Sequence, residues 1–384
     1  MTDILTVEQD AIIRTVDRIA ERYDRRYWLD HAQTGTFPRS MWKALADAGI
    51  LGIAVPEPYG GTGLGLLEMA LVQERLAEHG VPLLLFVVGP GLSLMPIVRH
   101  GTADQMHKFV KPAVTGDKVF CFGITEPGAG SNTMKIETFG RRTAHGYRVT
   151  GQKVFISGAE HADYMLLVAR TAAYNPQTRD GLSLMVIDLK APGVRVVPQE
   201  MLVQSLERQA QVFLEDVEVP DSAVIGEAGH GFRYLFDALN PERINVAAMA
   251  VGLGRYLTTR AVDYAKTREV FGVSIGSHQS LQHPLAEAKT HLELAWLMNL
   301  RAAEVYDQGG APGEYANMAK LGAVDAALEA ADIAIEVHGG NGFTRDYDLL
   351  SIWTLCRLLK TAPVSRELVL SYIGHHVLGL PASY

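Results

Sequence analysis

The chain has 384 residues, enough for roughly two to four domains. Its 48% hydrophobic and 20% charged residues are typical of a globular protein and exclude extensive disorder. The net charge of −8 gives no general electrostatic reason to bind nucleic acid, and Cys121 and Cys356 have neither disulfide-scaffold nor zinc-site spacing.

The N-terminal sequence has no basic segment followed by an apolar core, so we expect no secretory signal and a cytoplasmic location. The uncharged run at residues 81–98 has nearly the length of a membrane span. Prolines and glycines interrupt it, however, which favours a buried core segment over a membrane helix.

Residues 6–115 have a helical pattern. Thr6 and Gln9 fit a capping box, and the apolar residues that follow recur at helical spacing as far as Tyr23. Pro38 and Gly49 bracket a second helix, and residues 66–78 predict another.

Residues 118–225 change to strand patterns. Short runs rich in Val, Leu, Ile and Phe are separated by Gly, Pro and Asp, at residues 142–149 (a hairpin), 164–170, 182–188, 194–197 and 211–219. No helix-length segment separates them, so the pattern predicts a β-barrel or sandwich instead of a doubly wound sheet.

Long helices rich in Ala and Leu return after residue 231, at residues 243–268, 281–308 and 314–337. Helices of this length predict a bundle, and Ala-rich faces suit close helix packing or an oligomer interface. The predicted domains are therefore helical (1–117), β (118–227) and helical (228–384).

The sequence lacks the Rossmann glycine pattern G-x-G-x-x-G, the zinc-protease motif H-E-x-x-H and the hydrolase motif G-x-S-x-G. Its histidines are scattered, and we expect no metal site. Two other segments carry chemical information.

The first segment is F-G-I-T-E-P-G-A-G-S-N at residues 122–132. Gly128 and Gly130 allow a ligand close to the backbone, and such a loop presents N–H donors suited to a phosphate or to the edge of a ring. The alternative is a plain turn.

The second segment begins at residue 151 and reads G-Q-K-V-F-I-S-G-A-E-H-A-D. Alternation along a strand places Phe155 and Ser157 on one face, where a ring and a hydroxyl suit a flat heteroaromatic ligand. An ordinary amphipathic strand is the alternative.

Together these segments resemble the acyl-CoA dehydrogenase family, in which they read T-E-P-x-A-G-S-D and G-x-K-x-W-I-T-N-A-x-x-A-D. Further matches lie at residues 56–61, 242–243, 264–272, 279 and 339–343. The resemblance implies an N-terminal helical domain, a central β domain, a C-terminal four-helix domain, bound FAD and, commonly, a tetramer.

The resemblance also implies an FAD site. Phe155 replaces the usual tryptophan beside the isoalloxazine, and Ser157 keeps a hydroxyl for flavin N5. Arg268 would clamp the pyrophosphate of a neighbouring subunit's FAD, since guanidinium binds phosphate oxygens bidentately. The remaining implied FAD-binding residues are Phe122, Ile124, Thr125, Gly130, Ser131, Phe271, Gln279, Glu336, Gly339 and Gly340.

The catalytic base of many family members is a glutamate in a C-terminal turn, and this position is Pro363 here. The nearest carboxylate, Glu367, falls on the helix that follows. In a second family arrangement, found in isovaleryl- and long-chain-type enzymes, the base is the glutamate of an E-R pair, which is Glu242 here, followed by Arg243. We therefore expect Glu242 to be the base, and Ser131, Arg243 and Pro363 to contact substrate.

Proline at this position also removes a backbone N–H that, in the family, helps to polarise the thioester carbonyl. Either Ala362 or Val364 supplies that N–H, or the site does not perform the usual oxidation. The leading hypothesis is an acyl-CoA dehydrogenase that forms a 2,3-double bond and passes electrons to an electron-transfer flavoprotein. The alternatives are a flavin monooxygenase or oxidase on the same fold, and a non-catalytic partner subunit.

Overall fold

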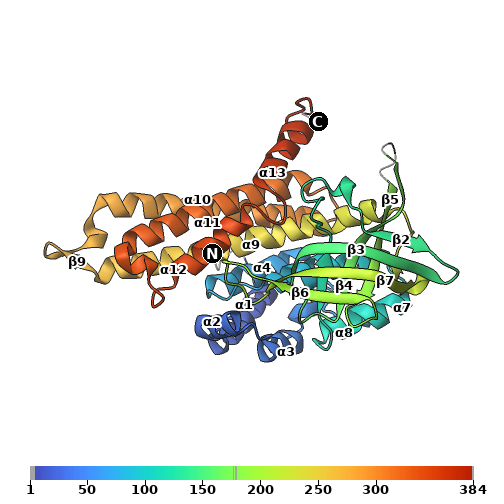
Figure 1. Ribbon diagram of the computed structural model, residues 1–384. Coiled ribbons are helices and arrows are strands. Elements are labelled where there is room, and N and C mark those ends of the chain that lie inside the picture. Colours follow the sequence, from blue (N-terminus) through green and yellow to red (C-terminus); the bar gives the residue numbers. More distant parts are fainter. Residues whose placement is uncertain (1–4, 176, 178–179, 383–384) are drawn as a thin grey trace. The chain divides into compact units, whose positions relative to one another are not determined.

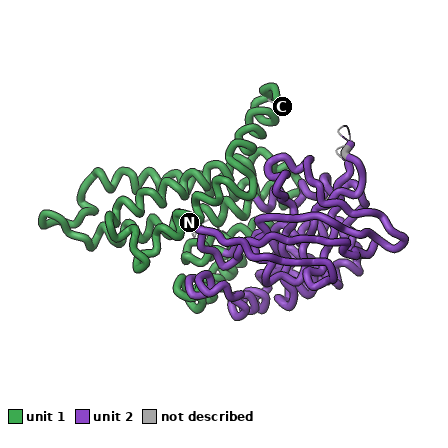
Figure 2. The backbone as a smooth tube through the Cα atoms, viewed as in Figure 1, with its two compact units in different colours: residues 1–28, 65–82, 243–384 green, residues 29–64, 83–242 purple. Residues whose placement is uncertain are grey.

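The computed structural model describes residues 5–175, 177 and 180–382. Two compact units are present (Figure 2): unit 1 contains residues 1–28, 65–82 and 243–384, and unit 2 contains residues 29–64 and 83–242. Each unit therefore combines segments that are far apart in the sequence. The three-domain division at residues 117 and 227 stays a prediction.

Unit 2 is built on an eight-stranded sheet in the order β6-β7-β3-β2-β4-β5-β8, with β1 paired to β4 (Figure 1). The pairs are antiparallel except β1–β4 and β2–β4, which are parallel. The strands are β1 (Phe120–Gly123), β2 (Phe139–Arg142), β3 (Gly146–Ser157), β4 (Tyr164–Asn175), β5 (Asp180–Asp188), β6 (Val194–Gln199), β7 (Gln209–Pro220) and β8 (Val224–Ile225). The predicted β region and its hairpin at residues 142–149 are confirmed.

Short helices accompany the sheet in unit 2: α3 (Arg39–Asp47), α5 (Leu84–Phe86), α6 (Leu94–His100), α7 (Ala103–Gln105) and α8 (Lys111–Val114). The uncharged run at residues 81–98 is largely buried and includes a π-helical segment, Val87–Ser93, that packs on β1. The expectation of a core segment is confirmed. In the part of the chain that the structure describes, no helix combines the length and hydrophobicity needed to cross a membrane.

Unit 1 is helical. Its helices are α1 (Val7–Arg22), α4 (Leu66–Glu78), α10 (Gln279–Asp307), α11 (Gly313–His338), α12 (Leu349–Leu359) and α13 (Arg366–Tyr372), joined by part of α9 (Gly231–Thr267). Thr6 caps α1 with Gln9, as predicted. Small side chains let α10 and α11 pack closely, with a buried cluster of Ala288, Leu292, Ala326 and Ala330.

Two helices, α2 (Arg25–Thr34) and α9, contain residues of both units, and α9 also extends beyond its predicted start. Helix α9 begins at Gly231, twelve residues before the predicted start at residue 243, and it contains Pro241 in its interior. Proline usually ends a helix because it lacks an N–H and contacts the preceding turn. The predicted start at residue 243 was wrong, because α9 continues on the N-terminal side of Pro241.

Candidate functional site

The glycine-containing segment after β1 forms a turn in which most residues are exposed and Ala129 is buried. Glu126 and Ala129 exchange two backbone hydrogen bonds of 3.2 and 3.1 Å, which close the turn. A Cβ added to Gly128 or Gly130 would contact nothing within 4 Å. Ser131 is exposed, whereas Ala129 is buried, so the turn presents its glycine backbone and one hydroxyl to solvent.

Strand β3 is bulged where it passes this turn. The pairing of β3 with β7 shifts register between Lys153 and Ile156, and the Val154 N–H donates instead to the Thr125 carbonyl at 2.9 Å. Phe155 adopts a left-handed backbone conformation (φ +58°) and is 52% exposed. Both features are unusual for an aromatic residue and are common where a bulge directs a side chain toward a ligand.

A buried ion pair joins the two predicted segments. Lys153 is fully buried, and its Nζ lies 2.7 Å from Oε1 of Glu126 and 2.9 Å from the carbonyl of Ile124. The structure therefore brings residues 124–131 and 153–157 together. Phe122, on β1, is also buried (8% exposed).

The Ser157 hydroxyl already has a protein partner. Nε2 of Gln209, on the neighbouring strand β7, donates to Ser157 Oγ at 2.9 Å. Gln209 therefore fixes the hydroxyl that the resemblance assigns to flavin N5.

Glu242 is a buried carboxylate in α9. It directly follows Pro241 and is only 4% exposed. Glu367, by contrast, is exposed in the first turn of α13. A base that removes a carbon-bound proton needs a site from which water is largely excluded, and Glu242 satisfies this condition better than Glu367.

The remaining predicted FAD-binding residues belong to unit 1. Arg268 and Gln279 are exposed on either side of the β9–β10 hairpin (Glu269–Val270 and Val273–Ser274), which lies at one end of the long helices (Figure 1). Phe271, at the tip of this hairpin, is 98% exposed.

The turn after α11 contains Gly339 and Gly340. A Cβ added at either glycine would contact nothing within 4 Å, and Glu336 is exposed beside them. Nδ2 of Asn341 donates to the Tyr264 hydroxyl at 3.1 Å, and this bond joins the turn to the end of α9 near Arg268. The structure thus brings the Gly339–Gly340 turn close to the end of α9 that precedes Arg268.

The turn between α12 and α13 contains Pro363. The Ala362 N–H donates to the Leu358 carbonyl at 2.9 Å, so it is already used within the turn. Lys320, a buried residue of α11, donates to the carbonyl of Val364. Of the two amides next to Pro363, the Val364 N–H is therefore the better candidate to replace the missing donor.

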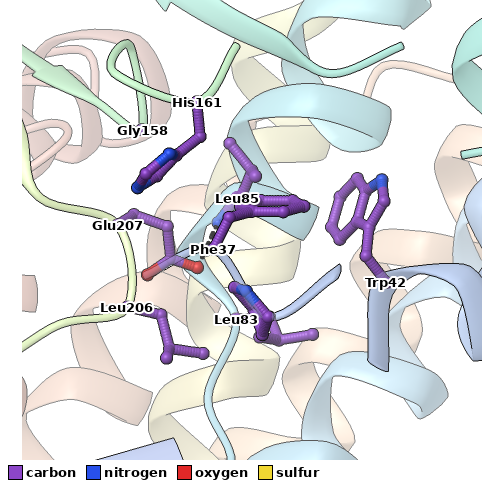
Figure 3. A pocket seen from close by; sticks show the side chains of 9 residues that line it. Phe37, Trp42, Leu83, Leu85, Gly158, His161, Leu206 and Glu207 are labelled. Atoms are coloured by element: carbon purple, nitrogen blue, oxygen red, sulfur yellow. Dashed lines mark hydrogen bonds between the residues drawn. The ribbon is translucent and has the colours of Figure 1, made fainter. Parts of the chain in front are cut away.

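A separate recess in unit 2 contains none of the predicted site residues (Figure 3). It encloses about 270 Å³, open solvent included, and most of its lining is apolar. Oε1 of Glu207 accepts the Leu85 N–H at 2.9 Å there, and burial raises the pKa of Glu207. The lining residues are Phe37, Pro38, Trp42, Leu83, Leu85, Gly158, His161, Leu206 and Glu207.

Comparison with known proteins identifies the family. The sequence matches the N-terminal, middle and C-terminal domain models of acyl-CoA dehydrogenases at residues 6–117, 121–217 and 229–377. Acyl-CoA dehydrogenase FadE12 of Mycobacterium tuberculosis is 43% identical over 390 residues, covering 100% of both chains. The chain belongs to the acyl-CoA dehydrogenase family.

Solved structures confirm the acyl-CoA dehydrogenase fold. Butyryl-CoA dehydrogenase from Megasphaera elsdenii has a TM-score of 0.92 at 27% identity, covering 97% of this chain and 99% of that one. A chain from a structure described as the electron transferring flavoprotein of Acidaminococcus fermentans has a TM-score of 0.93 at 29% identity, covering 97% and 98%. This acyl-CoA dehydrogenase is thus an oxidoreductase acting on CH–CH groups.

The family uses FAD, and solved relatives include FAD complexes. The residues of this acyl-CoA dehydrogenase fit that cofactor. The uncrowded glycines at 128 and 130 allow close approach of a phosphate or ring edge, and Phe155 offers an exposed ring for the isoalloxazine.

Sequence reasoning missed three residues that shape this site: Glu126, Lys153 and Gln209. Glu126 and Lys153 were inside the quoted motifs, but nothing in the spacing shows that they pair. Gln209 lies on a different strand, and only the β3–β7 register brings it to Ser157.

Proposed function

We propose that this acyl-CoA dehydrogenase introduces a 2,3-double bond into an acyl-CoA thioester, with Glu242 as the catalytic base. The observation that carries the proposal is the burial of Glu242 (4% exposed), combined with the absence of any carboxylate in the turn at residues 361–365. A buried carboxylate at the family's second base position supports removal of the α-proton.

The chain's own groups have defined parts in this reaction. Glu242 takes the α-proton of the thioester and holds it after the double bond has formed. FAD, when bound, would supply the two-electron acceptor for the β-hydride. Ser157, held by Gln209, would offer its hydroxyl to flavin N5, and the exposed Phe155 would pack beside the ring.

Polarisation of the thioester carbonyl is the step that this chain must perform differently from many relatives. Pro363 has no N–H, and the Ala362 N–H is already bonded to Leu358. We propose that the Val364 N–H is the donor and that Arg243 and Ser131 contact the substrate. Lys320 supports this role because it holds the Val364 carbonyl.

The altered turn also favours a second candidate function. Loss of one such donor costs roughly 10²–10³ in rate, so a site without it would suit a different flavin reaction, such as that of a monooxygenase or oxidase. A non-catalytic partner subunit is a further alternative.

The deciding experiment is an anaerobic titration of the FAD-loaded protein with a panel of acyl-CoA thioesters. We expect at least one thioester to bleach the flavin and to yield the 2,3-enoyl product. If no thioester bleaches the flavin, and the chemically reduced protein reacts rapidly with oxygen, an oxygenase or oxidase function replaces the proposed dehydrogenase function.

We further propose that electrons pass to an electron-transfer flavoprotein and that the enzyme works as a dimer or tetramer. The first proposal is supported by the relative from the electron transferring flavoprotein structure. The second is supported by the exposure of Phe271. A cytoplasmic location stays a prediction.

A further inference from the structure

Lys153 and Glu126 form a buried ion pair that the chemistry proposed above does not use. Lys153 is 0% exposed, Glu126 is 6% exposed, and their charged atoms are 2.7 Å apart. Burying two charges is costly, and only excellent geometry with further hydrogen bonds offsets that cost. The role of the ion pair therefore lies in the neighbouring segments that its two side chains hold in place.

The Glu126 carboxylate closes the base of the glycine-containing loop. Its Oε2 accepts the N–H of Glu137 at 2.6 Å, and its Oε1 accepts the N–H of Thr138 at 3.0 Å. Glu126 stands at the start of the loop, and residues 137 and 138 stand at its end. One carboxylate thus ties together both ends of the segment that presents Gly128 and Gly130.

Lys153 ties the same loop to the bulge of β3. Its ammonium bonds the Ile124 carbonyl at 2.9 Å, and the next residue, Val154, donates to Thr125. The residue after that is Phe155, with its left-handed backbone and exposed ring. A displacement of Lys153 would therefore move the loop and the ring together.

Both groups are charged near neutral pH. Burial raises the pKa of the Glu126 carboxyl, but Lys153 and the loop N–H donors outweigh it and hold that pKa below its usual value of 4.5. Burial lowers the pKa of Lys153 to about 8, against the opposing effect of Glu126.

We propose that the Lys153–Glu126 pair is a positioning unit for FAD, which holds the loop at residues 127–132 and the Phe155 ring in one binding geometry. The proposal rests on FAD binding by the family and not on thioester oxidation, so its failure and that of the proposed function are distinguishable.

The test uses Lys153→Met, Glu126→Gln and the double variant, with full-length apoprotein reconstituted with FAD. Each single variant leaves one buried charge without its partner, so both apoprotein stability and FAD affinity should fall. We expect the Kd for FAD to rise roughly 10- to 100-fold, the range for losing a hydrogen bond to a charged group. The bound flavin's visible spectrum should also shift as Phe155 loosens.

The double variant separates positioning from simple stabilisation. Removing both charges eliminates the unpaired ion, so the thermal midpoint of the apoprotein should return toward that of the wild type. FAD affinity should stay low, because the loop loses its side-chain links to β3 and keeps only the Val154–Thr125 backbone bond. Recovery of affinity together with stability would overturn the proposal, as would wild-type affinity in either single variant. If the single variants do not fold, the double variant decides.

Lys118→Met is the matched control. Lys118 forms an ion pair with Asp163 in the same unit at 3.0 Å, but neither residue contacts the loop in any described interaction. Its loss should leave the FAD affinity unchanged.

Acid release of FAD is a second readout. A carboxyl with a lowered folded pKa stabilises the fold above its unfolded pKa, and that contribution is lost as pH falls through the folded value. Lys153→Met removes the main charge that lowers the Glu126 pKa, so the variant should release FAD at a higher pH than the wild type. Release at the same pH would contradict the role of the ion pair.

Discussion

Burial distinguishes the two carboxylates that could act as the base. Glu242 is 4% exposed within α9, whereas Glu367 lies at the exposed start of α13. Both positions are visible in the sequence, but their difference in solvent exposure is not. The difference predicts which substitution abolishes proton abstraction.

Glu242→Gln should slow flavin reduction by the best thioester by roughly 10²–10⁴, because the amide keeps the shape and cannot accept the proton. Anaerobic stopped-flow measurement of flavin bleaching gives the rate. FAD content should not change. Glu367→Gln is the control, and slow reduction in this variant with normal reduction in Glu242→Gln would reverse the assignment.

Arg268→Ala should weaken FAD retention, since the pyrophosphate loses a bidentate partner. The FAD-to-protein ratio after gel filtration measures the effect, which should be a loss of cofactor from a protein that otherwise carries about one FAD per chain. Lys266→Ala removes a nearby exposed cation on α9 and should retain its FAD. Equal loss in both variants would indicate a general charge effect.

At the scale of elements, a buried charge network joins three helices of unit 1. Arg255 of α9 lies 2.5 Å from Glu74 of α4 and 2.9 Å from Glu293 of α10. Arg255 and Glu74 are 5% and 4% exposed. Burial raises the pKa of Glu74 to about 7, against the lowering effect of Arg255. The network fixes how these helices face each other.

Arg255→Met should lower the free energy of unfolding by up to about 3–5 kcal/mol, because it breaks a buried ion pair. Burial raises the pKa of Glu74 to about 7, so uptake of a proton by the unpaired carboxyl reduces this loss at neutral pH. Urea unfolding of the apoprotein measures the loss. Arg301→Met is the control, since Arg301 forms an exposed pair with Glu304 at 3.5 Å and should cost less than about 1 kcal/mol. Similar losses in both variants would show that burial does not matter here.

At the scale of the whole molecule, unit 1 exposes large apolar side chains that a water-soluble surface does not require. Phe271 is 98% exposed, Phe343 67%, Leu294 61% and Leu297 53%. Large apolar side chains this exposed in a free chain are often covered at a protein interface. Self-association of this chain would cover these residues.

The purified protein should therefore be an oligomer of at least two chains by light scattering at micromolar concentration. Phe271→Asp should reduce the mass or release FAD, since it places a charge in the predicted contact. Leu202→Asp, at a fully exposed position of unit 2, should do neither. A wild-type monomer with FAD still bound would contradict the prediction.

The sequence predicted most elements well because their signals are local. Capping by Thr6, the strand runs and the hairpin at residues 142–149 depend on neighbouring residues, and all are confirmed. The predicted start of α9 at residue 243 was wrong, because the helix continues through Pro241, a residue that is unfavourable in a helix interior.

The sequence by itself determined the family, the use of FAD and the residue types at each site position, because motifs along the chain record which chemical groups are present. It also showed that the usual catalytic turn has no carboxylate. Only the tertiary structure decided that Glu242 is buried while Glu367 is exposed, that Lys153 pairs with Glu126, and that Gln209 holds Ser157. Burial and partner choice depend on packing between distant segments, which local sequence does not encode.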